Sequence, residues 1–232
     1  MKVIVTGASK GIGRGIAAVL ASEGYELGLL ARSYNLLEEF QNQHADKKIH
    51  IAQCDLRNFD DTQDAIASLI DKMNGIDALI NNAGMVLRKN VMEISLDEWH
   101  AQIETNINGV FYTTRSTLPA MIEQKHGHII NISSISGKVP LPGGSGYAAS
   151  KYAVTGFSQS LFQEVREHNI KVTTLFPGSV DSASHRHEAS ADHSWKVSPQ
   201  DVGHSCHHIL QSAPQTCISE LEIRPLHKAP KK

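Results

Sequence analysis

The sequence predicts an α/β fold built on a doubly wound parallel sheet. Short, β-rich apolar runs alternate with longer segments of helical periodicity along the whole chain, which is typical of βαβ units. Most of the short runs are continuously apolar, as expected for strands covered on both faces. No internal repeat, low-complexity stretch or Pro/Ser-rich linker divides the sequence. We therefore predict one domain, residues 1–232, with about seven parallel strands flanked by helices on both faces.

Each expected element follows from its apolar pattern and from the residues that end it. The predicted strands are Val3–Thr6, Glu26–Ala31, Ile49–Gln53, Ala78–Asn81, His128–Ile132, Lys171–Phe176 and Ile218–Ile223. The predicted helices are Ile12–Ser22, Leu36–Gln43, Asp60–Met73, Leu96–Glu123, Tyr147–Glu167 and Pro199–Gln211. Stop signals near three helix ends are Gly24, Asn74-Gly75 and His126-Gly127. The long helix contains Asn106, Asn108, Gly109 and Pro119, which disturb its regularity.

The composition argues against several classes of protein. Lys+Arg 22 against Asp+Glu 24 gives a formal net charge of -2, so the chain lacks the basic excess that nucleic-acid binding requires. The three cysteines, Cys54, Cys206 and Cys217, show no C-x-x-C spacing, which argues against a disulfide framework or a zinc site. The apolar run Val3–Val5 is too short for a signal peptide, and no stretch approaches a membrane span. We expect a cytoplasmic protein that binds neither nucleic acid nor membrane.

A glycine-rich segment, Thr6-Gly7-Ala8-Ser9-Lys10-Gly11-Ile12-Gly13, joins the first strand to the first helix. Glycine permits a tight turn and lets backbone N–H groups approach a pyrophosphate, whose charge is favoured at a helix N-terminus. The spacing differs from G-x-G-x-x-G, and a glycine-rich turn can be only a turn. Its strand–turn–helix context favours a dinucleotide site. The expected cofactor-binding residues here are Gly7, Ser9, Lys10, Gly11, Ile12 and Gly13.

The end of the second strand indicates which dinucleotide is bound. A fold of this type that prefers NAD usually carries Asp or Glu there, to bind the ribose 2′-hydroxyl. Here the chain reads Ala31-Arg32-Ser33, without a carboxylate. Arg32, helped by Lys10, could instead pair with a 2′-phosphate. This favours NADP(H) over NAD(H), although both side chains could also be ordinary surface cations.

Tyr147 and Lys151 are four residues apart in a helical segment, so both project from one face. This pair alone is weak evidence, but it follows further motifs in a fixed order. These are the glycine segment, Asn81-Asn82-Ala83-Gly84, Asn106 and Ser134, with Pro177-Gly178 after the pair. The combination resembles the short-chain dehydrogenase/reductase family over nearly the whole chain. The resemblance implies a Rossmann-type fold.

The resemblance also implies roles for individual residues. Ser134, Tyr147, Lys151 and Asn106 match the catalytic tetrad, and Ser133 lies one place too early. The matched cofactor contacts are Asp55 at the adenine ring, Asn82 and Ala83 beside the cofactor, and Pro177, Gly178, Val180 and Ser182 near the nicotinamide carboxamide, with Tyr147 and Lys151 also in contact. Family members commonly assemble as homodimers or homotetramers, so a homo-oligomer is expected from the resemblance.

These residue types suit hydride-transfer chemistry. A phenol with an unperturbed pKa near 10 is a poor acid–base catalyst at neutral pH. We expect Lys151, together with the positive ring of the oxidised cofactor, to lower the pKa of Tyr147. Tyr147 would then exchange a proton with the substrate oxygen, while Ser134 donates a hydrogen bond to the developing alkoxide. The resemblance implies that Lys151 also binds the nicotinamide ribose and that Asn106 supports a proton-passing water.

The segment Ser179–Lys196 is short of apolar residues and rich in histidine, and we expect residues 179–198 to be a substrate loop. An exposed connection without a role is equally compatible with its composition. His185 or His187 could touch the substrate. His204 and His208 have the i, i+4 spacing of metal ligands, but no carboxylate or cysteine completes a set, so no metal is expected.

The favoured function is an NADP(H)-dependent oxidoreductase that acts on a small carbonyl or alcohol, such as a 3-oxoacyl compound, a ketone, an aldehyde or a hydroxy acid. Two alternatives stay open: an NAD-dependent alcohol dehydrogenase, and a non-catalytic regulator that binds NADP(H) on the same fold. The complete set of Asn106, Ser134, Tyr147 and Lys151 favours the enzyme.

Overall fold

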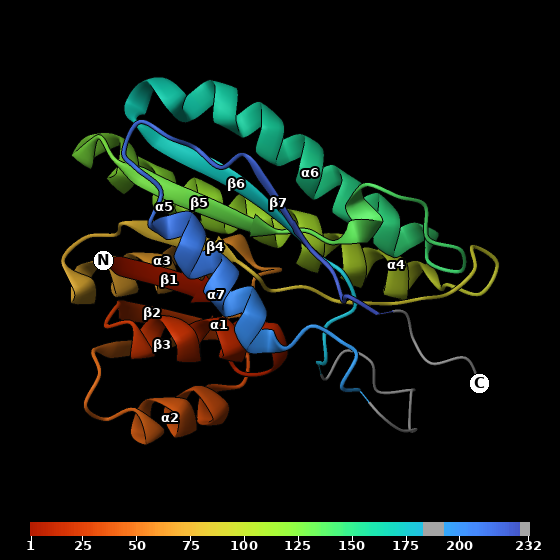
Figure 1. The fold of residues 1–232 in the computed structure, drawn as a ribbon, viewed down its shortest axis with the longest axis horizontal. Helices are drawn as coiled ribbons and strands as arrows, with labels where there is room; N and C mark the ends of the chain where they lie inside the picture. The colour runs from red at the N-terminus through yellow and green to blue at the C-terminus, as the bar shows by residue number, and fades with distance from the viewer. Residues whose placement is uncertain (183–192, 228–232) are drawn as a thin grey trace.

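Seven strands form one parallel sheet between two layers of helices (Figure 1). The computed structural model describes residues 1–182 and 193–227. The strands are β1 Lys2–Thr6, β2 Glu26–Ala31, β3 Ile49–Gln53, β4 Ala78–Asn81, β5 Gly127–Ile132, β6 Ile170–Pro177 and β7 Glu220–Ile223. Their order in the sheet is β3-β2-β1-β4-β5-β6-β7, and every neighbouring pair is parallel. The predicted doubly wound α/β fold is confirmed.

The helices cover both faces of this sheet (Figure 1). They are α1 Gly11–Ser22, α2 Tyr34–Gln43, α3 Phe59–Met73, α4 Leu96–Ile103, α5 Gly109–Gln124, α6 Ser145–Val165 and α7 Pro199–Leu210. Helices α1, α2 and α7 share one apolar cluster, while α3, α5 and α6 share the other. In the described part of the chain, no helix is both long and apolar enough to cross a membrane.

The two clusters follow from the alternation of side chains along the strands. In β1, Val3 and Val5 face the cluster of α1, whereas Ile4 between them faces the cluster of α3. In β5, Ile129 and Ile130 divide in the same way. The inner strands β1, β2, β4, β5 and β6 are therefore buried on both faces, which explains why their sequences are largely apolar rather than alternating. The outer strands β3 and β7 are more exposed.

Helices α1 and α7 pack unusually closely beside the start of the sheet. A Cβ atom at Gly15 would lie 2.4 Å from the Cβ of Pro199, and one at Gly203 would lie 2.8 Å from a methyl group of Val19. Only glycine permits this approach at either position. The contact holds α1, and with it the glycine-rich segment at its start, against the last helix of the chain.

The long helix expected at Leu96–Glu123 forms, but it is not uniformly α-helical. Its middle is a π-helical turn, Glu104–Asn108, between α4 and α5. Such turns insert an extra residue and are frequent at functional sites. Pro119 is accommodated inside α5. Asn106, Asn108 and Gly109 therefore mark a change from π-helix to α-helix, and the helix is not broken there.

Other differences from the expected elements are confined to their ends. The last strand starts at Glu220 rather than Ile218. Helix α5 ends with Lys125 in the left-handed conformation, at φ 57, and not at Gly127, which begins β5. Helix α6 starts two residues before Tyr147, at Ser145, and passes into a 3-10 turn at Arg166–His168.

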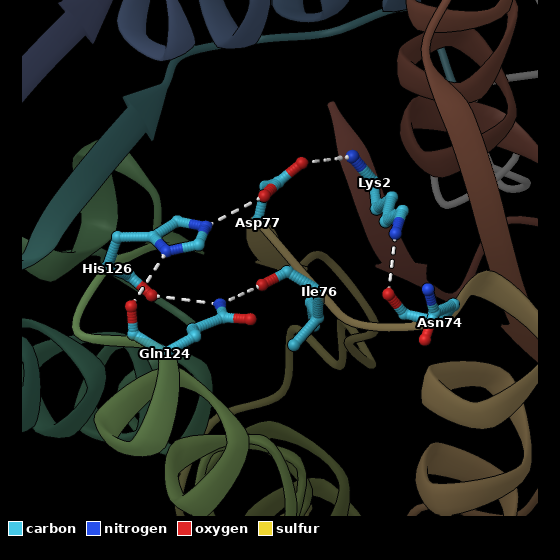
Figure 2. A network of polar contacts seen from close by, with 6 residues as sticks. All are labelled: Lys2, Asn74, Ile76, Asp77, Gln124 and His126. Atoms are coloured by element: carbon cyan, nitrogen blue, oxygen red, sulfur yellow. Dashed lines mark hydrogen bonds and ion pairs between the residues drawn. The ribbon is translucent and has the colours of Figure 1, made fainter.

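A polar network closes the end of the sheet at which the strands begin (Figure 2). The carboxylate of Asp77 accepts a hydrogen bond from the backbone N–H of Lys2 at 2.7 Å and contacts the ring of His126 at 2.9 Å. Gln124 donates to the carbonyl oxygens of Ile76 and His126. The contacts tie β1, β4 and β5 together at the amino-terminal edge, which leaves the opposite edge to the candidate site.

Candidate active site

The order of the strands reverses between β1 and β4, so the connections that leave these strands run to opposite sides of the sheet. In open α/β sheets, such a reversal leaves a crevice at the carboxyl ends of the strands. A cavity of about 370 Å³ lies at this edge. Seven of the predicted site residues line it: Ile12, Ser134, Tyr147, Pro177, Gly178, Val180 and Ser182.

Tyr147 lies in the first turn of α6 and is buried, with 8% of its surface exposed. Burial raises the pKa of its phenol, while hydrogen bonding with Ser134 and the charge of Arg88 lower it by smaller amounts. The net effect is a raised pKa of Tyr147. Lys151 is not among the groups that lower this pKa in the cofactor-free chain, and the expected lowering by Lys151 together with the oxidised cofactor ring stays a prediction.

Lys151 lies near the ring of Tyr147. Its Nζ lies 5.9 Å from the centroid of the Tyr147 ring and donates to the carbonyl oxygen of Ile132 at 2.9 Å. The side chain is buried, and burial lowers the pKa of its ammonium group to about 8. The ammonium group is thus held near the ring of Tyr147 by a backbone carbonyl.

Ser134 caps the 3-10 turn Ile135–Gly137 at the end of β5, where its Oγ accepts a hydrogen bond from the backbone of Ser136 at 3.1 Å. The neighbouring Ser133 is buried, and its Oγ donates to the carbonyl oxygen of Lys151 at 3.0 Å. Ser133 therefore fixes the helix that carries Lys151. Ser134 is the one of the two that interacts with the phenol of Tyr147.

Asn106 is buried inside the π-helical turn, and its amide is fully occupied by protein groups. Its Oδ1 accepts from the backbone N–H of Met85 at 2.7 Å, and its Nδ2 donates to the Met85 carbonyl at 2.9 Å and to Ser150 Oγ at 2.9 Å. Asn106 thus joins the segment after β4 to helix α6. The structure brings it close to Lys151, because both groups lie beside Gly84.

The glycine-rich segment forms the turn that the spacing predicted. Gly7 and Gly11 have φ values of 66 and 55, which favour glycine. A Cβ atom at Gly13 would lie 2.3 Å from the carbonyl oxygen of Gly7. Asn82 holds the turn in place, since its Nδ2 donates to the carbonyl oxygens of Thr6 and Gly7 at 2.9 and 3.3 Å.

The chain offers surfaces that fit a dinucleotide. The N-cap residue of α1, Lys10, makes no side-chain hydrogen bond to the first turn, and no acidic residue lies there, so its N–H groups and dipole can receive a phosphate. Near Tyr147 and Lys151, where the nicotinamide half is expected, a Cβ atom at Gly84 would lie 3.6 Å from Lys151 Nζ and 3.5 Å from Asn106 Oδ1. The exposed glycine thus places no side chain over the buried lysine.

The groups predicted to contact the adenosine part lie together at the ends of β2 and β3. Hydrogen bonds from Arg57 are the main cause of a lowered pKa at the Asp55 carboxyl group. Arg32 is exposed, and its charge lowers the same pKa by a smaller amount. The carboxylate of Asp55 pairs with the guanidinium of Arg57 at 2.6 Å. Arg57 was missed by sequence reasoning, and it occupies the oxygen atoms through which Asp55 would bind an adenine amino group.

The segment after β4, around Met85–Lys89, was expected from the sequence to help choose the substrate, although no individual residue in it could be assigned a role. Val86 and Arg88 line the cavity, and Gln102 accepts a hydrogen bond from the backbone of Leu87 at 2.8 Å. Their short, irregular sequence carries no motif, so only the fold reveals their position. Arg224, just beyond β7, lines the cavity as well.

The predicted substrate loop is described only at its two ends. Its His185 and His187 lie outside the described residues. The ends are held together by backbone hydrogen bonds between Ser179 or Asp181 and Val197, and Trp195 lines the cavity. Within residues 1–182 and 193–227, no group of three or more His, Cys, Asp or Glu side chains could hold a metal ion.

The sequence matches the family described as short chain dehydrogenase over residues 1–193. The chain belongs to the short-chain dehydrogenase family. It is 34% identical over 223 residues to an uncharacterized oxidoreductase of Staphylococcus aureus strain N315, a match that covers 96% of each chain. The resemblance seen in the sequence motifs is thereby confirmed, and the protein is an oxidoreductase of this family.

Solved structures agree with this assignment. The closed form of a serine dehydrogenase complexed with NADP+ is 30% identical, with a TM-score of 0.91 over 100% of this chain and 98% of that one. A metagenomic short-chain oxidoreductase in complex with NADP is 32% identical, with a TM-score of 0.86 over 98% of each chain. These neighbours of the short-chain dehydrogenase fold bind a nicotinamide cofactor.

Proposed function

We propose that this short-chain dehydrogenase is an NADP(H)-dependent oxidoreductase that interconverts a small carbonyl compound and its alcohol. The observation that carries the proposal is the meeting of Tyr147 and Ser134 at one cavity, with the buried ammonium group of Lys151 behind the phenol. A bound nicotinamide supplies the hydride for this reaction. The protein's own residues orient the substrate and move the proton.

Tyr147 is the proposed general acid in the direction of reduction. Since burial raises the pKa of its phenol, Tyr147 holds its proton at neutral pH, which is the form needed to protonate a carbonyl oxygen. Ser134 donates a hydrogen bond to the same oxygen as negative charge develops there. Lys151 stabilises the phenolate that is left and binds the ribose hydroxyl groups. Asn106 positions α6 through Ser150 and the segment after β4 through Met85.

NADP(H) is the proposed cofactor, rather than NAD(H). Arg32 projects from the end of β2, where no carboxylate stands to bind a ribose 2′-hydroxyl. Two structural neighbours contain NADP or NADP+, which supports the same choice.

The test of this function is turnover by the purified protein and its Tyr147→Phe variant. We expect the parent to consume NADPH with a suitable ketone or aldehyde. The variant keeps the aromatic ring but lacks the phenol hydroxyl group that donates the proton. We therefore expect turnover to fall at least ~100-fold, while NADPH affinity changes less than about threefold. Stopped-flow absorbance gives the first quantity and NADPH fluorescence titration the second. A Phe variant as active as the parent would overturn the role of Tyr147.

A further inference from the structure

The segment after β4 forms one wall of the active-site cavity and is held rigidly from behind. Asn106 binds both backbone groups of Met85, and Gln102 accepts from the backbone of Leu87. Lys89 pairs with Glu98 of α4 at 2.5 Å. The two residues between these anchors, Val86 and Arg88, line the cavity. Alternate residues of this segment thus hold it in place and form the wall.

Arg88 brings a positive charge to this wall that no described group neutralises. No aspartate or glutamate is among the described residues that line the cavity. The other arginine there, Arg224, pairs with Glu222. Arg88 makes no hydrogen bond or ion pair with any residue in the described ranges. Its guanidinium is nonetheless near enough to the phenol of Tyr147 to lower the pKa of that group.

The cofactor's phosphates are not the anions that this arrangement fits. Their expected site is the glycine-rich segment and the start of α1. Of the predicted contacts in that segment, Ile12 lines the cavity, whereas Gly7, Ser9, Lys10, Gly11 and Gly13 do not. Arg32, the proposed partner of the 2′-phosphate, also lies outside it. The charge of Arg88 therefore faces the space next to Tyr147 and Ser134, where the substrate reacts.

We propose that Arg88 binds a carboxylate of the substrate, so that the enzyme acts on oxo acids and their hydroxy acids in preference to uncharged ketones. The inference rests on the proposed function and names its substrate class. A guanidinium presents a planar fork of donors that matches a carboxylate. Apolar residues that line the same cavity, Val86, Val139 and Leu141, provide a surface for a short carbon chain between the carboxylate and the carbonyl. Arg88 would thus select the acid and align its carbonyl with Tyr147.

The test compares acids with their methyl esters. Three oxo acids, with the ketone at the second, third or fourth carbon, are assayed with NADPH beside the ester of each. For at least one pair we expect the parent to prefer the acid in kcat/KM by at least about tenfold, or about 1.4 kcal/mol. In Arg88→Gln that preference should vanish through loss of activity on the acid alone. Arg88→Lys should restore part of it, since it keeps the charge but not the fork.

Arg115→Gln is the matched control, since it removes one guanidinium at an exposed position of α5 that neither lines the cavity nor holds this segment. It should keep the parent's preference for the acid. Equal activity of the parent on acids and esters would overturn the carboxylate site while the proposed function stands. So would an equal loss on both substrates in Arg88→Gln.

A binding measurement separates failure of this inference from failure of the proposed function. If no compound is turned over, the proposed function is wrong. Titration calorimetry of 3-oxobutanoate into the NADP+ complex then tests the anion site alone. At least tenfold tighter binding by the parent than by Arg88→Gln supports it, and equal binding by the two proteins overturns it.

Discussion

At the scale of single residues, the candidate site depends on burial as much as on residue type. Tyr147 and Lys151 are both withdrawn from water, which raises the pKa of the phenol and lowers that of the ammonium group to about 8. Both shifts favour the uncharged form. The spacing Tyr-x-x-x-Lys predicts that the two side chains share a helix face, but it cannot show the depth of burial, which depends on Ile132 and the neighbouring strands.

Arg32 allows a prediction at the same scale. Arg32→Ala should lower the preference for NADPH over NADH by at least ~10-fold in kcat/KM, because it removes the charge proposed to bind the 2′-phosphate. The measurement is steady-state kinetics with each cofactor in turn. Lys47→Ala is the control, since Lys47 pairs with its neighbour Asp46 at 3.1 Å and lies away from the end of β2. An unchanged preference in Arg32→Ala would contradict the role of Arg32.

The sequence identifies residues that carry a motif and misses those that act through their place in the fold. Ser134 could be separated from Ser133 by its distance along the chain from Tyr147. Arg88, Gln102 and Arg57 could not be found in this way, since each owes its position to loops whose path the sequence pattern does not determine. The same holds for the occupied amide of Asn106, whose partners come from Met85 and Ser150.

At the scale of elements, a chain of buried polar groups joins helices α5 and α6 through two central strands. Thr113 donates to Asn81 Oδ1 at 2.6 Å, and Asn81 Nδ2 donates to Asn131 Oδ1 at 2.9 Å. Asn131 Nδ2 in turn donates to Ser158 Oγ at 2.8 Å. All four groups are buried. Each contact satisfies a polar atom that would otherwise be costly to bury, so the network fixes α6 relative to the sheet.

Breaking this chain at Asn131 should destabilise the fold. In Asn131→Leu, Asn81 loses one acceptor and Ser158 loses one donor inside the core. We expect the free energy of unfolding to fall by about 1–3 kcal/mol, as measured by urea denaturation followed by circular dichroism. Ser116→Ala is the control because, among the residues that the structure describes, its hydroxyl bonds only to the Tyr112 carbonyl within α5. It should cost about 0.5 kcal/mol or less. An equal effect of the two substitutions would show that the network does not stabilise the protein.

Element types were predictable from the sequence, while the helix transition was not. The strands and helices follow from apolar periodicity, and their ends differ by a residue or two. The π-helical turn at Glu104–Asn108 has no periodicity of its own. It requires the pairing of Asn106 with a segment about twenty residues earlier in the chain, which is a tertiary contact.

At the scale of the whole molecule, the carboxyl and amino edges of the sheet have different roles. The carboxyl edge holds the cavity and its reacting groups, while the amino edge holds the network of Asp77, His126 and Lys2 (Figure 2). The contact with Asp77 raises the pKa of His126. Burial alone would raise the pKa of the Asp77 carboxyl group, but the hydrogen bonds from His126 and the Lys2 backbone together outweigh it, so that this pKa is lowered. The homodimer or homotetramer expected from the resemblance stays a prediction. The exposed aromatic rings of Phe111 on α5 and Tyr152 on α6 are suited to such a contact.

The pair of Asp77 and His126 at the amino edge predicts a pH-dependent effect on stability without an effect on activity. Because the pKa of His126 is raised in the folded protein, its contribution is present below pH ~6.5 and is lost as the pH rises through the folded pKa. The lowered pKa of Asp77 sets the acid limit, since the pair weakens again as that carboxylate is protonated.

His126→Gln should therefore lower the free energy of unfolding more at pH 5.5 than at pH 8.5. The difference should stay below about 1 kcal/mol, because the His126 side chain is 55% exposed. Urea titrations at the two pH values measure it, and kcat at neutral pH should not change. A larger loss at pH 8.5 than at pH 5.5 would contradict the assigned direction.

The central claim, that Tyr147 protonates a carbonyl as hydride reaches it, is tested most directly by isotope transfer. NADPH carrying deuterium at C4 is incubated with an oxo acid, and the product is analysed by mass spectrometry. The parent should yield an alcohol that carries deuterium on its hydroxyl-bearing carbon. Tyr147→Phe, which still binds NADPH, should yield almost none in the same time. Equal labelling of the product by the two proteins would contradict the account.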